Sequence, residues 1–112
     1  LCCNLEQGGW TPSPATIQVA REKLAIAIFV LIRPRIGDFN YSELEVEQMQ
    51  ADITFCKEVG VDGVVIGVLN DKGEIDIEKN KLLLESFNWI VNNNCNSITT
   101  TRIYNRVSFI FL

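Results

Sequence analysis

The stretch from Leu24 to Tyr41, which reads LAIAIFVLIRPRIGDFNY, constrains the fold of this 112-residue chain more than any other. Its apolar run, residues 25–32, lacks the polar alternation of a half-exposed strand and is too short to cross a membrane. The run predicts a central parallel strand that is buried on both faces. Because Pro34 cannot donate to a strand ladder and disfavours helix at Arg33, the strand should end there.

Three charged side chains follow this predicted strand, namely Arg33, Arg35 and Asp38. In α/β sheets and barrels the C-terminal ends of the strands are where ligands bind. Guanidinium groups suit carboxylate and phosphate groups because they donate two parallel hydrogen bonds. The alternative is an internal ion pair of the arginines with Asp38 or Glu6 that ties the loops together. The residues alone leave both interpretations open.

Three helices and a second buried strand are predicted from capping residues and apolar spacing. Ser13 with Pro14 begins the first helix, and a capping box from Ser42 to Glu45 begins the second. The predicted elements are helices at 14–23, 43–59 and 77–87 and strands at 25–32 and 61–69. The repeat of strand, loop and helix indicates an α/β fold built from βα units.

From about residue 86 the composition changes. Residues 92–97 are polar, residues 99–101 are threonines, and residues 107–112 are apolar and uncharged. One interpretation is a polar loop followed by a last strand, and the other is a divergent ending joined to a truncated fold. We favour the second, because complete domains normally bury or interrupt an apolar, charge-free run.

Composition excludes several classes of protein. The net charge of −4 and the scattered basic residues argue against nucleic acid as a partner, and no apolar run is long enough to span a membrane. Neither CxxC spacing nor a secretory signal is present, so Cys2, Cys3, Cys56 and Cys95 are expected to be free thiols in the cytoplasm. Cys56 lies on the apolar stripe of the second helix and is interpreted as a small buried hydrophobe. Histidine, the commonest metal ligand and general base, is absent.

Several short motifs together carry a resemblance to a known family. They are Leu1-Cys2, Gly8-Gly9 with Thr11-Pro12-Ser13, Ile32-Arg33-Pro34-Arg35 with Gly37-Asp38-Phe39 and Tyr41-Ser42, and Asp62-Gly63 with Gly67. On these residues the chain resembles the CutC copper homeostasis family from residue 1 to about 85. It departs from the family at Cys3, Gln7 and Ile36, and residues 86–112 do not match the family's His-Arg-Ala-Phe-Asp motif.

The resemblance implies a fold and a function. The fold would be a partial TIM-type (β/α)8 barrel of about three βα units over residues 1–85, truncated at both ends, followed by a divergent segment over 86–112. The function would be copper homeostasis in the cytoplasm, with the nucleus left open as a second compartment. Cu(I) would bind the thiolate of Cys2 together with a cysteine of the family's first strand, which this sequence lacks. Soft thiolates are preferred ligands of Cu(I).

Two other functions stay open from the residues. One is a metal-independent barrel enzyme that binds a small anionic metabolite through Arg33, Arg35 and Asp38. The other is a truncated chain with no activity of its own. Exposed sheet edges would make a homo-oligomer possible in each case.

Overall fold

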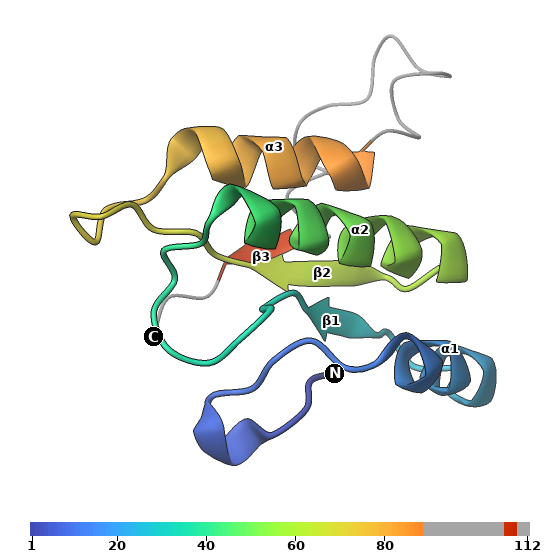
Figure 1. The fold of residues 1–112 in the computed structure, drawn as a ribbon. Coiled ribbons are helices and arrows are strands. Elements are labelled where there is room, and N and C mark those ends of the chain that lie inside the picture. The colour runs from blue at the N-terminus through green and yellow to red at the C-terminus, as the bar shows by residue number, and fades with distance from the viewer. Residues whose placement is uncertain (89–106, 110–112) are drawn as a thin grey trace, which may run out of the picture.

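The computed structural model describes residues 1–88 and 107–109, and Figure 1 shows their arrangement. The described part of the chain is an α/β structure with a parallel sheet, as predicted. Its elements are a short 3-10 helix η1 (Leu5–Gln7), the helices α1 (Pro14–Lys23), α2 (Glu43–Val59) and α3 (Ile77–Asn88), and the strands β1 (Phe29–Leu31), β2 (Gly63–Ile66) and β3 (Val107–Phe109).

The strands lie in the order β1-β2-β3, and each pairs in parallel with the next. Because successive strands are parallel, α2 returns the chain from β1 to β2, and it lies beside α3 over the same face of the sheet (Figure 1). Val30 and Val64 are register partners that face this helical layer, and both are fully buried in the core. Phe29 and Val65 alternate with them and are only half-buried. The helices therefore cover one face of the sheet.

The predicted helices are confirmed together with their caps. The Ser13 side chain accepts a hydrogen bond from the Thr16 amide before α1, and both bonds of the capping box are formed before α2. Gly60 ends α2 with a φ of 83°, a conformation that glycine adopts without strain. The predicted apolar stripe of α2 is fully buried, and it consists of Val46, Met49, Ile53 and Cys56.

The strands are shorter than predicted. Residues 25–27 are exposed and lie before β1. The guanidinium of Arg21 binds the carbonyls of Leu24 and Ile26, and the Asp62 carboxylate accepts from the Ile28 amide at 2.8 Å. The ladder of β1 and β2 begins only after these contacts, because side chains have already taken the preceding backbone groups.

At the C-terminal end, β3 pairs with β2 at Val64, Val65 and Ile66, so a last strand is present at Val107–Phe109. The polar segment 89–106 and residues 110–112 lie outside the described residues. The predicted domain boundary near residue 85 therefore stays a prediction. None of the helices in the described part of the chain combines the length and the apolar character needed to cross a membrane.

Candidate functional site

Three segments meet at the C-terminal ends of β1 and β2, and we call this region the rim (residues 1–11, 33–41 and 69–75). The Thr11 amide donates to the Arg33 carbonyl at 2.9 Å, and the Leu69 amide donates to the Phe39 carbonyl at 2.8 Å. These bonds hold the loop after β1 between the N-terminal segment and the loop after β2. The rim is thus the place where the predicted site residues Cys2, Arg33, Arg35 and Asp38 lie.

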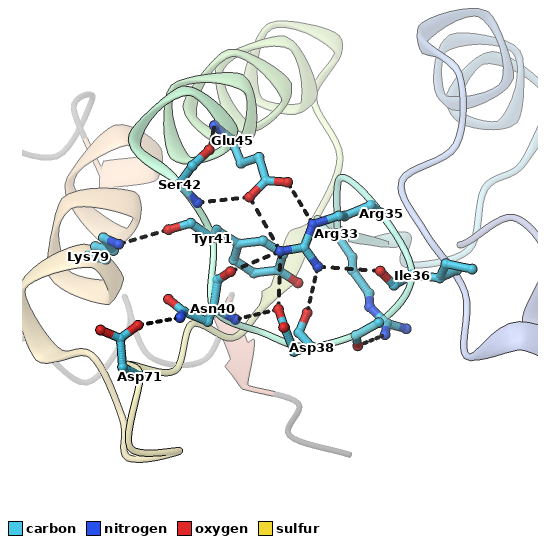
Figure 2. A network of polar contacts seen from close by, with 11 residues as sticks. Arg33, Arg35, Ile36, Asp38, Asn40, Tyr41, Ser42, Glu45, Asp71 and Lys79 are labelled. Carbon is cyan, nitrogen blue, oxygen red and sulfur yellow. Dashed lines mark hydrogen bonds and ion pairs between the residues drawn. The ribbon is translucent and has the colours of Figure 1, made fainter.

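Arg35 is the centre of an internal ion-pair network. Its Nε donates to Glu45 Oε1 at 2.6 Å, and its Nη2 donates to Asp38 Oδ1 at 3.1 Å (Figure 2). The guanidinium also lies over the Tyr41 ring, 5.1 Å from its centroid. The hydrogen bond between the Arg35 and Glu45 side chains raises the pKa of Arg35 and lowers the pKa of Glu45.

The pairing of Arg35 with Asp38 is the ion-pair alternative that the sequence left open, whereas Glu45 was missed as a partner. The available signal was the capping box, because its Glu45 side chain reaches back to the Ser42 amide at 2.8 Å and so toward the loop that carries Arg35. Arg35 therefore ties the loop after β1 to the first turn of α2.

Arg33 has a different environment. Its side chain is buried, its Nη1 donates to the Gly9 carbonyl at 3.1 Å, and its Nη2 donates to the Gly37 carbonyl at 2.8 Å. Its guanidinium also lies 4.9 Å from the centroid of the Phe39 ring. Within the described residues, no carboxylate forms an ion pair with Arg33, and its buried Nε has no hydrogen-bond partner. This cation is held by carbonyl dipoles and an aromatic face instead of an opposite charge.

Tyr41 closes the loop after β1. Its carbonyl accepts from Lys79 Nζ at 2.8 Å, which fastens the loop to α3 (Figure 2). Its hydroxyl is buried and has no hydrogen-bond partner among the described residues. Burial raises the pKa of Tyr41, and the nearby charge of Arg33 opposes that shift. The phenol therefore stays protonated at neutral pH and is able to donate a hydrogen bond.

Cys2 lies at the rim beside β1. The amino group of Leu1 donates to the Phe29 carbonyl at 2.6 Å, and the Leu31 amide donates to the Leu1 carbonyl at 3.0 Å, which is the pattern of parallel pairing. The Cys2 side chain packs against Gly9, whose φ is 81° and where an added Cβ would lie 3.3 Å from Cys2 Sγ. The thiol of Cys2 is free and half-buried.

The other cysteines differ in their surroundings. Cys3 is also free and half-buried, and its backbone pairs antiparallel with Trp10. Cys56 is fully buried, and burial raises the pKa of its thiol to about 12. Its interpretation as a small buried hydrophobe is confirmed, whereas Cys95 lies outside the described residues. Within residues 1–88 and 107–109, no group of three or more His, Cys, Asp and Glu side chains is arranged to hold a metal ion.

A buried asparagine that the sequence reasoning missed shapes the end of β2. Asn80 Oδ1 accepts from the Val68 amide at 3.2 Å, and Asn80 Nδ2 donates to the carbonyls of Val68 and Asp76 at 2.8 and 2.7 Å. The pairing of β2 with β3 reaches Ile66, and the Asn80 side chain takes the backbone groups beyond it. Asn80 therefore fixes the loop after β2, where Asp71 accepts a hydrogen bond from Asn40 at 2.5 Å (Figure 2).

Parallel strands, helical returns between them and a charged loop at the C-terminal rim define an α/β protein built from βα units. The family model described as "CutC family" matches residues 1–100, and the chain belongs to this family. The resemblance carried by the short sequence motifs is thereby confirmed, and the match extends past residue 85.

The relatives agree with this membership. The chain is 46% identical over 86 residues to a family protein CutC of Xanthomonas campestris, which covers 77% of this chain and 36% of the relative. It is 50% identical over 78 residues to the human copper homeostasis protein cutC homolog, which covers 70% of this chain and 29% of the relative. The chain thus spans 29% to 36% of the length of these curated relatives.

A solved structure shows the same arrangement. The crystal structure of the putative copper homeostasis protein CutC from Streptococcus agalactiae superposes with a TM-score of 0.75 at 40% identity. The superposition covers 78% of this chain and 43% of that chain. The described α/β arrangement is therefore similar to part of a CutC structure.

Proposed function

We propose that the chain serves copper homeostasis as part of a TIM-type (β/α)8 barrel. Family membership supports the function, and the parallel strands with α2 and α3 over one face support the barrel. A barrel of this type has eight such units in about 250 residues, and its ligands bind at the C-terminal rim of the strands. The open face with Phe29 and Val65 would be the inside of the barrel.

We further propose that Cu(I) is the cargo and that the thiolate of Cys2 is one of its ligands. The supporting observation is that Cys2 has a free, half-buried thiol at the rim, beside β1. Binding would release the thiol proton and form a bond from sulfur to copper. One thiolate is a weak site, because Cu(I) is selected by several soft ligands.

Competition against a Cu(I) chelator under reducing, oxygen-free conditions tests this proposal. Replacing Cys2 by serine should weaken Cu(I) binding, because a hydroxyl is a hard ligand. The matched control is Cys56→Ala, which removes a thiol that is buried in the core and should leave the affinity unchanged. An unchanged affinity in Cys2→Ser would show that the copper site lies elsewhere.

A second candidate function is that of a metal-independent barrel enzyme that binds a small anionic metabolite through Arg33, Arg35 and Asp38. The observation that favours it is the buried guanidinium of Arg33, which has no carboxylate partner among the described residues. A panel of small carboxylates and phosphates, read by thermal shift, tests it. Stabilisation that disappears in Arg33→Lys would support anion binding, and the same stabilisation in both proteins would contradict it.

A further inference from the structure

Two buried polar atoms at the rim have no hydrogen-bond partner among the described residues, namely Arg33 Nε and Tyr41 Oη. The exposed fractions of these residues are 6% and 1%. Folded proteins pair nearly all such groups, because a buried donor that has lost water and gained no partner is destabilising. Their occurrence together at the ligand-binding end of parallel strands calls for a common cause.

The two groups lie near each other. The charge of the Arg33 guanidinium and its hydrogen bonding to the Tyr41 hydroxyl lower the pKa of the phenol against the larger effect of burial, although neither Arg33 Nε nor Tyr41 Oη has a hydrogen-bond partner of good geometry among the described residues. Both groups are able to donate, because the guanidinium Nε–H is a donor only and the phenol is kept protonated by burial, although the phenol oxygen is also able to accept. Two neighbouring donors beside a positive charge are suited to an oxygen atom that bears negative charge.

Arg35 provides the contrast. Its charge is matched by Glu45 and Asp38, and its donors are also used by the carbonyls of Ile36 and Asn40. An anion at Arg35 would have to displace two carboxylates, whereas an anion at Arg33 would displace none of the described ones. The unmatched positive charge of the loop therefore lies at Arg33.

We propose that Arg33 Nε and Tyr41 Oη together bind one oxygen of a carboxylate or phosphate group, and that Arg35 is a positioning residue that fixes the loop around this site. The proposal deepens and rests on the second candidate function. The exposed turn at 36–38 lies beside this site and is joined to the guanidinium by the hydrogen bond from Arg33 Nη2 to the Gly37 carbonyl.

The experiment is a titration of the isotope-labelled full chain with inorganic phosphate, and separately with malonate, followed by NMR of the arginine Nε–Hε signals. Sodium chloride at matched ionic strength is the control for screening. The Arg33 signal should shift and saturate, whereas the signal of Arg21, which is paired with Asp62 at the other end of the strands, should not. A shift with malonate alone would assign the site to carboxylates, and a shift with phosphate alone would assign it to phosphate groups.

Two variants test the named atoms. Tyr41→Phe removes only a hydroxyl that has no partner, so the fold should persist and the affinity for the effective anion should fall about tenfold. Arg33→Lys keeps the charge but lacks the Nε–H group and should lose the same binding, and Arg21→Lys is the matched control. Thermal unfolding of each variant verifies that it is folded.

The outcomes separate the two proposals. A shift at Arg35 in place of Arg33, or an unchanged affinity in both Tyr41→Phe and Arg33→Lys, overturns the site proposed here but leaves anion binding by the loop in place. If no arginine signal responds to either anion beyond the chloride control, both this site and the second candidate function are wrong.

Discussion

Replacing Asn80 by alanine should destabilise the fold, because one buried side chain satisfies both backbone groups of Val68. The asparagine accepts from the Val68 amide at 3.2 Å and donates to the Val68 carbonyl at 2.8 Å. Val68 is fully buried, so water cannot replace these partners without opening the structure. The perturbation therefore leaves a buried N–H group without an acceptor.

The structure sets the size of the effect. Leaving the Val68 N–H group without an acceptor should lower the free energy of unfolding by about 1–3 kcal/mol. The Val68 carbonyl loses less, because the Asp76 amide still donates to it at 3.1 Å. Alanine forms helix better than asparagine, which offsets up to about 0.7 kcal/mol. The net loss is about 2 kcal/mol, which lowers the melting temperature of a domain of this size by about 10 °C.

Thermal and urea unfolding followed by circular dichroism measure this loss. Lys81→Ala is the matched control, because Lys81 is the next residue of α3 and its side chain is exposed. Hydrogen exchange should also show that the Val68 amide is protected in the parent chain and unprotected in Asn80→Ala. If the two variants unfold within about 0.5 kcal/mol of each other and Val68 stays protected, the assigned role of Asn80 is refuted.

Three further predictions concern other parts of the molecule. In the native chain at about pH 8, iodoacetamide should label Cys56 more than about a hundredfold more slowly than Cys2, because the thiolate is the reactive form and burial raises the pKa of the Cys56 thiol. Equal labelling of the two cysteines in peptide mapping would contradict the burial of Cys56. Arg35 lowers the pKa of Glu45 in the folded state, so the stabilisation is present while Glu45 is ionised and is lost as pH falls through its folded pKa. Glu45→Gln should therefore melt lower than the parent at neutral pH and lose less on acidification, and parallel melting curves across pH would argue against the pair. The sheet face left open by α2 and α3 should make the chain self-associate in sedimentation experiments, whereas a monodisperse monomer with cooperative unfolding would oppose this.

The helices were predictable because their signals are local. The capping box at Ser42 and the glycine at Gly60 lie next to the turns that they form, and both ends of α2 are as the sequence indicates. The apolar spacing between these ends predicted the buried stripe for the same reason. Neither signal depends on how the rest of the chain folds.

The strand limits were not predictable from the apolar runs, because residues distant in sequence set them. Residues 25–28 are as apolar as β1, but the Arg21 guanidinium binds the Ile26 carbonyl and the Asp62 carboxylate binds the Ile28 amide. The second run continues past Ile66, where Asn80 of α3 replaces a neighbouring strand. Hydrophobicity identified the segments that contain the strands, but it could not identify which partner each backbone group would find.

The two arginines of the rim also differ in how far their surroundings can be predicted from the sequence. Arg35 and Glu45 are ten positions apart, and the capping box directs the Glu45 side chain toward the loop before α2, so their pairing follows from a local rule. The surroundings of Arg33 are made by Gly9, Gly37 and Phe39, and Gly9 precedes Arg33 by 24 positions. Two residues of one type in one motif therefore differ in their surroundings: the charge of Arg35 joins a loop to a helix, and the charge of Arg33 has no carboxylate partner among the described residues.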